Sequence, residues 1–337
     1  MQESACGPRL KRARADASED GDTPRPTSED IKRDQVVWFD DGNIMLLAGG
    51  VAFRVYRGLL ALHSEIFADM FSVPQPESVE QLDGCPVIHL TDHPDELRHF
   101  LRDLFVDKKY NRHNETLPCT TVVALARLAH KYGIKDMLDD ALCRVQSCFS
   151  DNLYIWIRAD ENMHTHLMTF DRKDAVAAVN IARLTETTSM LPVALYMCCQ
   201  LEIQDIMNGV MQENGTVERL APGDVMKCLE ARKTLAYDNV VSAARIFTPV
   251  AHISCLSQES CTAHILGLFQ RLVNHRAGLD ICSSLGDWVP YILTSQSCKS
   301  LCGCCYEMVQ GRAIGEQEEV WRRLPKVMGV EVHGWMS

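Results

Sequence analysis

Two pairs of cysteines carry the clearest chemical pattern in this 337-residue chain. Cys302 and Cys305 are spaced C-x-x-C, with Cys304 between them, and Cys255 and Cys261 form a second, wider pair. Four thiolates in a tetrahedral array would hold a structural Zn²⁺ ion. The alternative is a set of free thiols in a core, because cysteine is among the most buried residue types. The spacing does not show whether the pairs meet, so both interpretations stay open, and we expect no cofactor other than this zinc ion.

A short basic run near the N-terminus is a second candidate signal. It consists of Arg9, Lys11, Arg12 and Arg14, and such runs serve nuclear import, although a solvated basic tail has the same pattern. Residues 1–34 are rich in charge, Pro and Ser, so we expect a disordered tail. The opening residues contain no apolar stretch typical of a secretory signal. We therefore expect a nuclear or cytoplasmic protein, or one found in both, whose 15 cysteines stay reduced.

The sequence does not favour an enzyme. The motifs G-x-x-x-x-G-K-[ST], G-x-G-x-x-G, H-E-x-x-H and G-x-S-x-G are missing, so no nucleotide-binding or common hydrolytic signature is found. The formal net charge of −11 opposes a nucleic-acid partner, because binding to phosphates needs a positive surface. No apolar run approaches the length of a membrane span, so we expect no membrane contact.

The elements that would position any site begin near Val36. Apolar spacing and turn residues predict three short strands, a helix pair over Leu59–Phe71, and three further helices. The strands are Ile44–Leu47, Val51–Tyr56 and Val87–Leu90, and the later helices are Pro94–Phe105, a helix from Val122 to Tyr132 and Met137–Phe149. The first two strands flank Gly49 and Gly50 and form a predicted hairpin. Only a compact mixed core would bury all these apolar faces together.

This order of elements resembles a known family. The stretch Trp38–Phe71, WFDDGNIMLLAGGVAFRVYRGLLALHSEIFADMF, is similar to the opening of BTB/POZ domains. The matching positions are Phe53, Tyr56, Arg57, Leu60, Ser64, Phe67, Met70 and Phe71. The segment WFDDGN, together with WRRLP near the C-terminus, looks most like the sequences of a large group of fungal BTB proteins. The resemblance covers residues 36–149 and implies an α+β fold, with a small sheet flanked by helices.

The resemblance also implies a function in protein–protein interaction. BTB domains often form homodimers through the first helix and the segment before it, which here are Leu59–His63 and Val36–Phe39. The predicted interface residues are Trp38, Phe39, Leu59, Leu60 and His63. The alternative is a monomer in which Trp38 and Phe39 cover their own core.

Two further partner sites follow from the resemblance, each with a departure from the family pattern. A charged groove at the dimer pairs an Asp with an Arg in some members. Arg57 matches the Arg, but Asn43 stands at the Asp position. Members that bridge cullins carry an apolar-x-Glu pattern, and here the positions are Leu97 and His99, so His replaces Glu.

The remaining chain is predicted to be mainly helical. Apolar spacing indicates helices over Asp174–Leu184, Pro192–Leu201, Pro222–Leu235, Ala243–Phe247, Cys261–Val273 and Tyr306–Leu324. We thus predict a tail over 1–34, a BTB/POZ domain over 35–150 and a helical domain over 151–337. The predicted function is dimerisation and recruitment of other proteins, with a ubiquitin-ligase adaptor that binds a cullin as one form. The alternative is a nuclear, transcription-associated regulator that uses the same domain as a scaffold and is stabilised by zinc.

Overall fold

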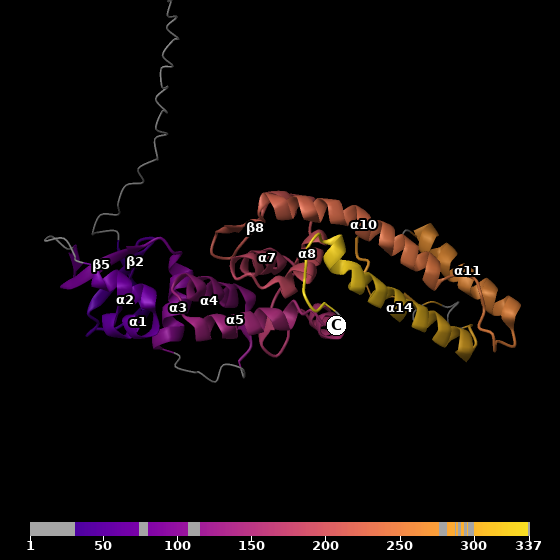
Figure 1. Ribbon diagram of the computed structural model, residues 1–337, viewed down its shortest axis with the longest axis horizontal. Helices are drawn as coiled ribbons and strands as arrows, with labels where there is room; N and C mark the ends of the chain where they lie inside the picture. Colours follow the sequence, from indigo (N-terminus) through magenta and orange to yellow (C-terminus); the bar gives the residue numbers. More distant parts are fainter. Residues whose placement is uncertain are drawn as a thin grey trace, which may run out of the picture.

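The N-terminal part of the molecule is a small β-sheet with helices packed against it (Figure 1). The computed structural model describes residues 31–73, 80–106, 115–275, 282–286, 288, 291–292, 295 and 300–335. The strands of the sheet are β1 (Lys32–Trp38), β2 (Ile44–Ala48), β3 (Val51–Val55), β4 (Gln81–Leu82) and β5 (Cys85–Leu90). Their order across the sheet is β1-β3-β2-β5-β4. The α+β fold class predicted from the sequence is therefore confirmed.

The hairpin of β2 and β3 forms as predicted. The two strands pair antiparallel, with Ile44 opposite Val55 and Ala48 opposite Val51. Gly49 and Gly50 close the turn with φ angles of 50° and 79°, a region of backbone that favours glycine. Strand β2 lies at the centre of the sheet and pairs with β5 on its other side, and it is buried along its whole length.

The sheet is larger than predicted, and order begins earlier. Strand β1 starts at Lys32, inside the segment expected to be a disordered tail, and it pairs parallel with β3. Asp34 is buried in this strand and accepts hydrogen bonds from the backbone N–H groups of Val36 (2.9 Å) and Val37 (2.8 Å). The guanidinium of Arg98 also donates to it at 2.6 Å. A buried carboxylate therefore holds the strand together with the buried Val37. The sheet has five strands, so the prediction of three was wrong.

Helices cover the sheet in the order that the sequence predicts. They are α1 (Arg57–His63), α2 (Glu65–Ser72), α3 (Pro94–Phe105), α4 (Cys119–Lys131) and α5 (Lys135–Cys148). Ser64 caps α2, since its Oγ accepts from the backbone N–H of Phe67 at 3.1 Å, and it donates to the carbonyl of Tyr132 at 2.6 Å. Gly133, with φ of 67°, separates α4 from α5.

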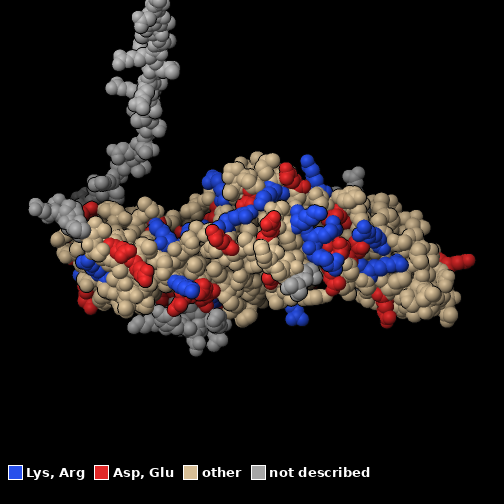
Figure 2. Space-filling view, in the orientation of Figure 1, with Lys and Arg blue, Asp and Glu red and all other residues tan. Residues whose placement is uncertain are grey.

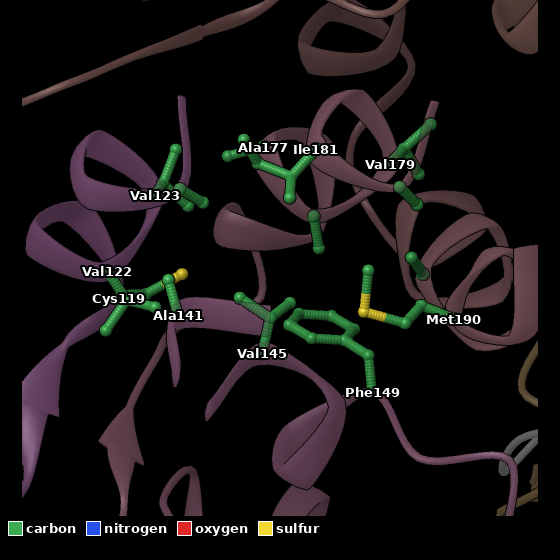
Figure 3. Packing of buried hydrophobic residues seen from close by; sticks show 14 of the residues in the cluster. Cys119, Val122, Val123, Ala141, Val145, Phe149, Ala177, Val179, Ile181 and Met190 are labelled. Carbon is green, nitrogen blue, oxygen red and sulfur yellow. The ribbon is translucent and has the colours of Figure 1, made fainter. Parts of the chain in front are cut away.

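The apolar core does not break at residue 150, where we predicted a domain boundary. Side chains of α4 and α5 pack directly against those of α7 (Asp174–Leu184) and the 3-10 turn η2 (Thr188–Met190) (Figure 3). The residues labelled there are Cys119, Val122, Val123, Ala141, Val145, Phe149, Ala177, Val179, Ile181 and Met190. The sheet region and the first helices of the second half therefore share one core.

The second half is mostly helical and extends away from the sheet (Figure 1). Besides α7, its helices are α6 (Leu153–Asn162), α8 (Leu191–Cys199), α9 (Ile203–Asn208), α10 (Pro222–Ile246), α11 (Gln258–His275) and α14 (Gly303–Val327). Two short strand pairs accompany them: β6 (Leu117–Pro118) with β7 (Met168–Thr169), and β8 (Val210–Met211) with β9 (Val217–Glu218). Among the described helices, none has the length and apolar character needed to cross a bilayer.

Helices α10 and α14 run side by side in opposite directions and form an arm that ends at α11 (Figure 1). The sequence predicted two helices where α10 is one, because polar residues interrupt its apolar spacing. Those polar residues face α14: Asp238 lies 3.4 Å from the guanidinium of Arg323, and Ser242 donates to Glu316 at 3.1 Å. Basic and acidic side chains accordingly lie next to one another over this arm (Figure 2).

Candidate functional site

Helices α1 and α2 expose a row of apolar side chains. Leu59 is 40% exposed, Leu62 is 74% exposed and Ile66 is 45% exposed, whereas Leu60 and Phe67 on the opposite side are fully buried. We call Leu59, Leu62 and Ile66 the α1–α2 face. Leu62 lies inside the predicted interface segment Leu59–His63 but is not among the interface residues predicted by name, and Ile66 lies outside that segment. The place of both in the helical spacing could have indicated them.

An acidic hollow of about 650 Å³ adjoins the α1–α2 face. Leu62 and His63 belong to its lining, together with residues of α3 and the first turns of α5. The residues that set its character are Asp103, Leu104, Lys135, Asp136, Met137 and Asp139. With Asp140, four carboxylates line the hollow against one lysine and give it a net negative lining. An apolar surface next to it is typical of a site that contacts another protein.

The aromatic side chains predicted for the interface, Trp38 and Phe39, pack mainly against residues of their own domain. Trp38 is half-buried and packs against the cluster of Met45, Leu47 and Ala52. The ring of Phe39 lies 5.0 Å from that of Tyr56, measured between centroids. Both side chains are half-buried against their own domain, and their part in a dimer stays a prediction.

Two predicted interface residues are corrected by their burial. Leu60 and Leu97 have no exposed surface and belong to the core cluster of the sheet region. The resemblance placed them on a contact surface, but the rotation of α1 and α3 about their axes directs both side chains inward. Neither side chain is available to a dimer partner or to a cullin.

Asn43 and Arg57 are brought together, but not as a charged groove. The side-chain Oδ1 of Asn43 accepts from the backbone N–H of Arg57 at 2.8 Å, at the start of α1. The guanidinium of Arg57 donates to the carbonyl of Phe71 at 2.6 Å and lies over the Phe71 ring. Both side chains therefore support the junction of β3, α1 and α2.

A second hollow, of about 320 Å³, lies between α3, α4, α7 and the β8–β9 turn. His99 lines it and is half-buried, and this burial lowers the pKa of its imidazole. Arg127 also lines this hollow and forms ion pairs with Glu96 and, at 3.1 Å, with Glu218. These contacts join the sheet region to the second half of the chain.

Asp174 in this second hollow gives a pH-dependent prediction. Burial raises the pKa of its carboxyl to about 6, whereas the ordinary pKa of Asp is about 4. Between pH 4 and pH 6 the folded chain keeps a proton on Asp174 that the unfolded chain has lost. The free-energy cost of burying the ionised carboxylate is therefore absent at pH 4, and it destabilises the fold increasingly as the pH rises through 6. We expect Asp174→Asn to stabilise the fold at pH 7.5 by about 1 kcal/mol and to have no effect near pH 4. Thermal unfolding of both proteins across this range is the measurement, and a difference that stays constant with pH would contradict it.

The two cysteine pairs of the sequence meet at the far end of the arm. The Sγ atoms of Cys255, Cys261, Cys302 and Cys305 all lie within 4.8 Å of one another. Cys255 stands in the loop between α10 and α11, Cys261 in the first turns of α11, Cys302 just before α14 and Cys305 in its first turn. Three of the four are buried and Cys302 is half-buried.

Backbone N–H groups point at this cysteine cluster. The N–H of His252 donates to Sγ of Cys305 at 3.3 Å, and the N–H of Ser257 donates to Sγ of Cys255 at 3.4 Å. The backbone N–H of Cys305 lowers the pKa of the Cys302 thiol to about 7. Such donors favour the thiolate form of sulfur, which is the form that binds metals. Burial acts in the other direction: it raises the pKa of the Cys305 thiol and raises that of Cys255 to about 12.

The basic run of Arg9, Lys11, Arg12 and Arg14 lies outside the described residues. The structure therefore adds nothing to the prediction of nuclear import.

In sequence, the chain is similar to a POZ-domain protein. The relative is TD and POZ domain-containing protein 4 of Mus musculus, 31% identical over 127 residues. The match covers 37% of this chain and 32% of the relative, so it spans about a third of either protein. No family model matches the chain, and no solved structure matches it. The similarity supports a BTB/POZ-type interaction domain over part of the chain, and it lends no support to the fungal grouping.

Proposed function

We propose that this chain is a protein-interaction module that forms a homodimer, in which a second copy of the chain binds to the α1–α2 face. The similarity to a POZ-domain protein supports an interaction domain and points away from a catalytic one. The observation that carries the proposal is the 74% exposure of Leu62, one helical turn after the exposed Leu59 on α1 and shortly before the exposed Ile66 on α2. Large apolar side chains are rarely exposed together on the surface of a protein unless another molecule covers them.

A second copy of the chain is the occupant that this face fits. In a two-fold dimer the same patch meets itself, so an apolar row on one copy finds an apolar row on the other. Leu59 and Leu62 of this face belong to the first helix of the domain, which the resemblance implies as the dimer element, and Ile66 belongs to the helix after it. Its three defining side chains are uncharged, and apolar residues at the centre are typical of protein interfaces.

Leu62→Glu tests the proposal. Two glutamates would be buried close together in the dimer, so we expect the variant to weaken self-association at least tenfold, or by about 1.4 kcal/mol. The measurement is the mass of the full chain in solution by light scattering over a range of concentrations. Wild type should have twice the mass of one chain, and the variant the mass of one.

Met226→Glu is the matched control, because Met226 is an exposed apolar residue on α10, far along the chain from the α1–α2 face. It should remain dimeric. A monomeric wild type at tens of micromolar, a concentration at which a stable dimer persists, would reject self-association. A Leu62→Glu variant that stays dimeric would show that the dimer forms through a surface other than the α1–α2 face.

We do not extend the proposal to cullin bridging. The position that the family uses for this contact is Leu97 here, and its side chain is fully buried. His99, the second position, faces the hollow between α3 and the β8–β9 turn. Recruitment of other protein partners remains part of the proposed function, with the acidic hollow beside Leu62 as the adjoining surface.

A further inference from the structure

We infer that Cys255, Cys261, Cys302 and Cys305 bind one structural zinc ion, which fastens the far end of the helical arm. This site is separate from the proposed dimer face and does not depend on it. It uses four side chains that come from three segments of the chain: the loop after α10, the start of α11 and the start of α14.

The spacing of the sulfur atoms fits a tetrahedral centre. With Zn–S bonds of about 2.3 Å, the sulfurs of a tetrahedral site lie about 3.8 Å apart. Sγ of Cys302 lies 3.6 Å from Sγ of Cys255, and all six pairs of Sγ atoms are within 4.8 Å. Small rotations of the side chains would therefore bring all four sulfurs to bonding distance.

The chemistry of the ligands selects the metal and its role. Four soft thiolates favour zinc or an iron–sulfur centre over ions that prefer oxygen, such as Mg²⁺ or Ca²⁺. Four protein ligands also fill a tetrahedral zinc site, which leaves no position for water or substrate. The site is therefore structural and not catalytic.

The surroundings of the sulfurs are suited to the negative charge of the complex. Zn²⁺ with four thiolates carries a net charge of about −2. The N–H groups of His252 and Ser257 donate to sulfur, and both Cys302 and Cys305 lie at the N-terminus of α14, where the helix dipole is positive. Hydrogen bonds of this kind orient metal ligands and stabilise them.

Beyond the apolar cluster that Ile246, Phe247 and Leu268 form with the start of α14, the loop that carries Cys255 is held by few apolar contacts. Among the described residues, the apolar cluster around the cysteines contains Ala251 and Leu301 besides the cysteines themselves. The neighbouring loop displays Ile253 and Leu256 almost fully exposed to solvent. A metal ion that crosslinks three segments would stabilise this region where apolar burial is small.

A disulfide between Cys255 and Cys302 is the competing use of these residues. Cys261 and Cys305 are close enough to form a second disulfide, but neither bond would need the N–H donors to Cys255 and Cys305. Both disulfides also need an oxidising environment. Zinc uses all four thiolates and these N–H donors at one centre and needs no oxidant.

The experiment measures the metal bound to the full chain, purified without chelators and with fresh reductant. Elemental analysis should find about one zinc ion per chain. Cys261→Ser and Cys305→Ser should each lose most of it. Cys304→Ser is the matched control, since Cys304 lies between two of the ligands yet is exposed and outside the cluster, and it should retain zinc.

A second measurement uses wild type only, so that it does not depend on variants that fold. Zinc is removed with a chelator, and hydrogen exchange is followed by mass spectrometry before and after zinc is returned. Protection of residues 250–275 and 300–310 should fall and then recover, while β2, β3 and α4 stay protected. Wild type without zinc after reconstitution, iron in place of zinc, a Cys255–Cys302 disulfide under reductant, or full zinc content in Cys305→Ser would each overturn the inference.

Discussion

Replacing Arg144 by methionine is expected to lower the free energy of unfolding by about 4 kcal/mol. Arg144 lies on α5 with no exposed surface. Its guanidinium donates to Asp140 at 2.9 Å and to the backbone carbonyls of Glu115 (2.8 Å) and Leu167 (2.9 Å). Methionine keeps much of the volume but removes every one of these bonds, and the buried acceptors lose a charged donor.

The contacts of Arg144 explain why the effect is large. Glu115 comes just before β6, and Leu167 comes just before β7, so one side chain ties both strands to α5. The backbone N–H of Leu117 also donates to the Leu167 carbonyl at 3.1 Å. Loss of the guanidinium therefore weakens the place where the sheet region continues into the second half.

Urea unfolding followed by circular dichroism measures this effect. Arg158→Met is the control, because Arg158 is exposed on α6, and it should change stability by less than about 0.5 kcal/mol. A double variant with Asp140→Asn should recover part of the loss, since it removes the carboxylate that Arg144 neutralises. An Arg144→Met protein as stable as wild type would show that these bonds contribute nothing.

The sequence predicted best where burial follows a regular spacing. Helix α3 begins and ends at Pro94 and Phe105 as expected, because its apolar residues lie on one side and Pro94 starts it. The β2–β3 hairpin is also local, since its turn residues and both strands are adjacent in the chain. In these elements the local pattern and the tertiary contacts agree.

Prediction failed where polar side chains are buried by partners far along the chain. Strand β1 depends on Asp34, which is held by Arg98 from α3. Helix α10 continues through Asp238 because Arg323 of α14 covers it. A single sequence does not reveal such partners, so sequence alone predicts a tail where β1 begins and a helix end where α10 continues.

The candidate sites show the same division. Spacing identified both cysteine pairs, but only the fold brings Cys255 to Cys302, since 46 intervening residues include α11. The resemblance identified α1 as an interface helix. It did not fix which side of α1 faces outward, so Leu60 was included, although it is buried, and Ile66 of the following helix was omitted.

Replacing Trp321 by alanine is expected to cost about 4 kcal/mol, because a large aromatic side chain is removed from a full core. Trp321 lies on α14, is fully buried, and stands between two other indoles. Ring centroids are 5.6 Å apart for Trp156 and Trp321, and 4.9 Å apart for Trp321 and Trp335. Trp156 in turn meets the ring of Tyr196 on α8 edge to face.

This aromatic stack attaches the arm to the shared core, so its loss should have a regional signature. The indole N–H of Trp335 donates to the carbonyl of Trp321 at 3.0 Å, which fastens the segment after α14 to the same place. Hydrogen exchange in Trp321→Ala should therefore rise most over residues 318–335, with a drop of roughly 10 °C in Tm. Trp321→Phe keeps a stacked ring and should lose less than half as much stability. Equal losses in the two variants would mean that ring stacking is unimportant here, and a loss below about 1 kcal/mol in Trp321→Ala would mean that the arm is attached mainly elsewhere.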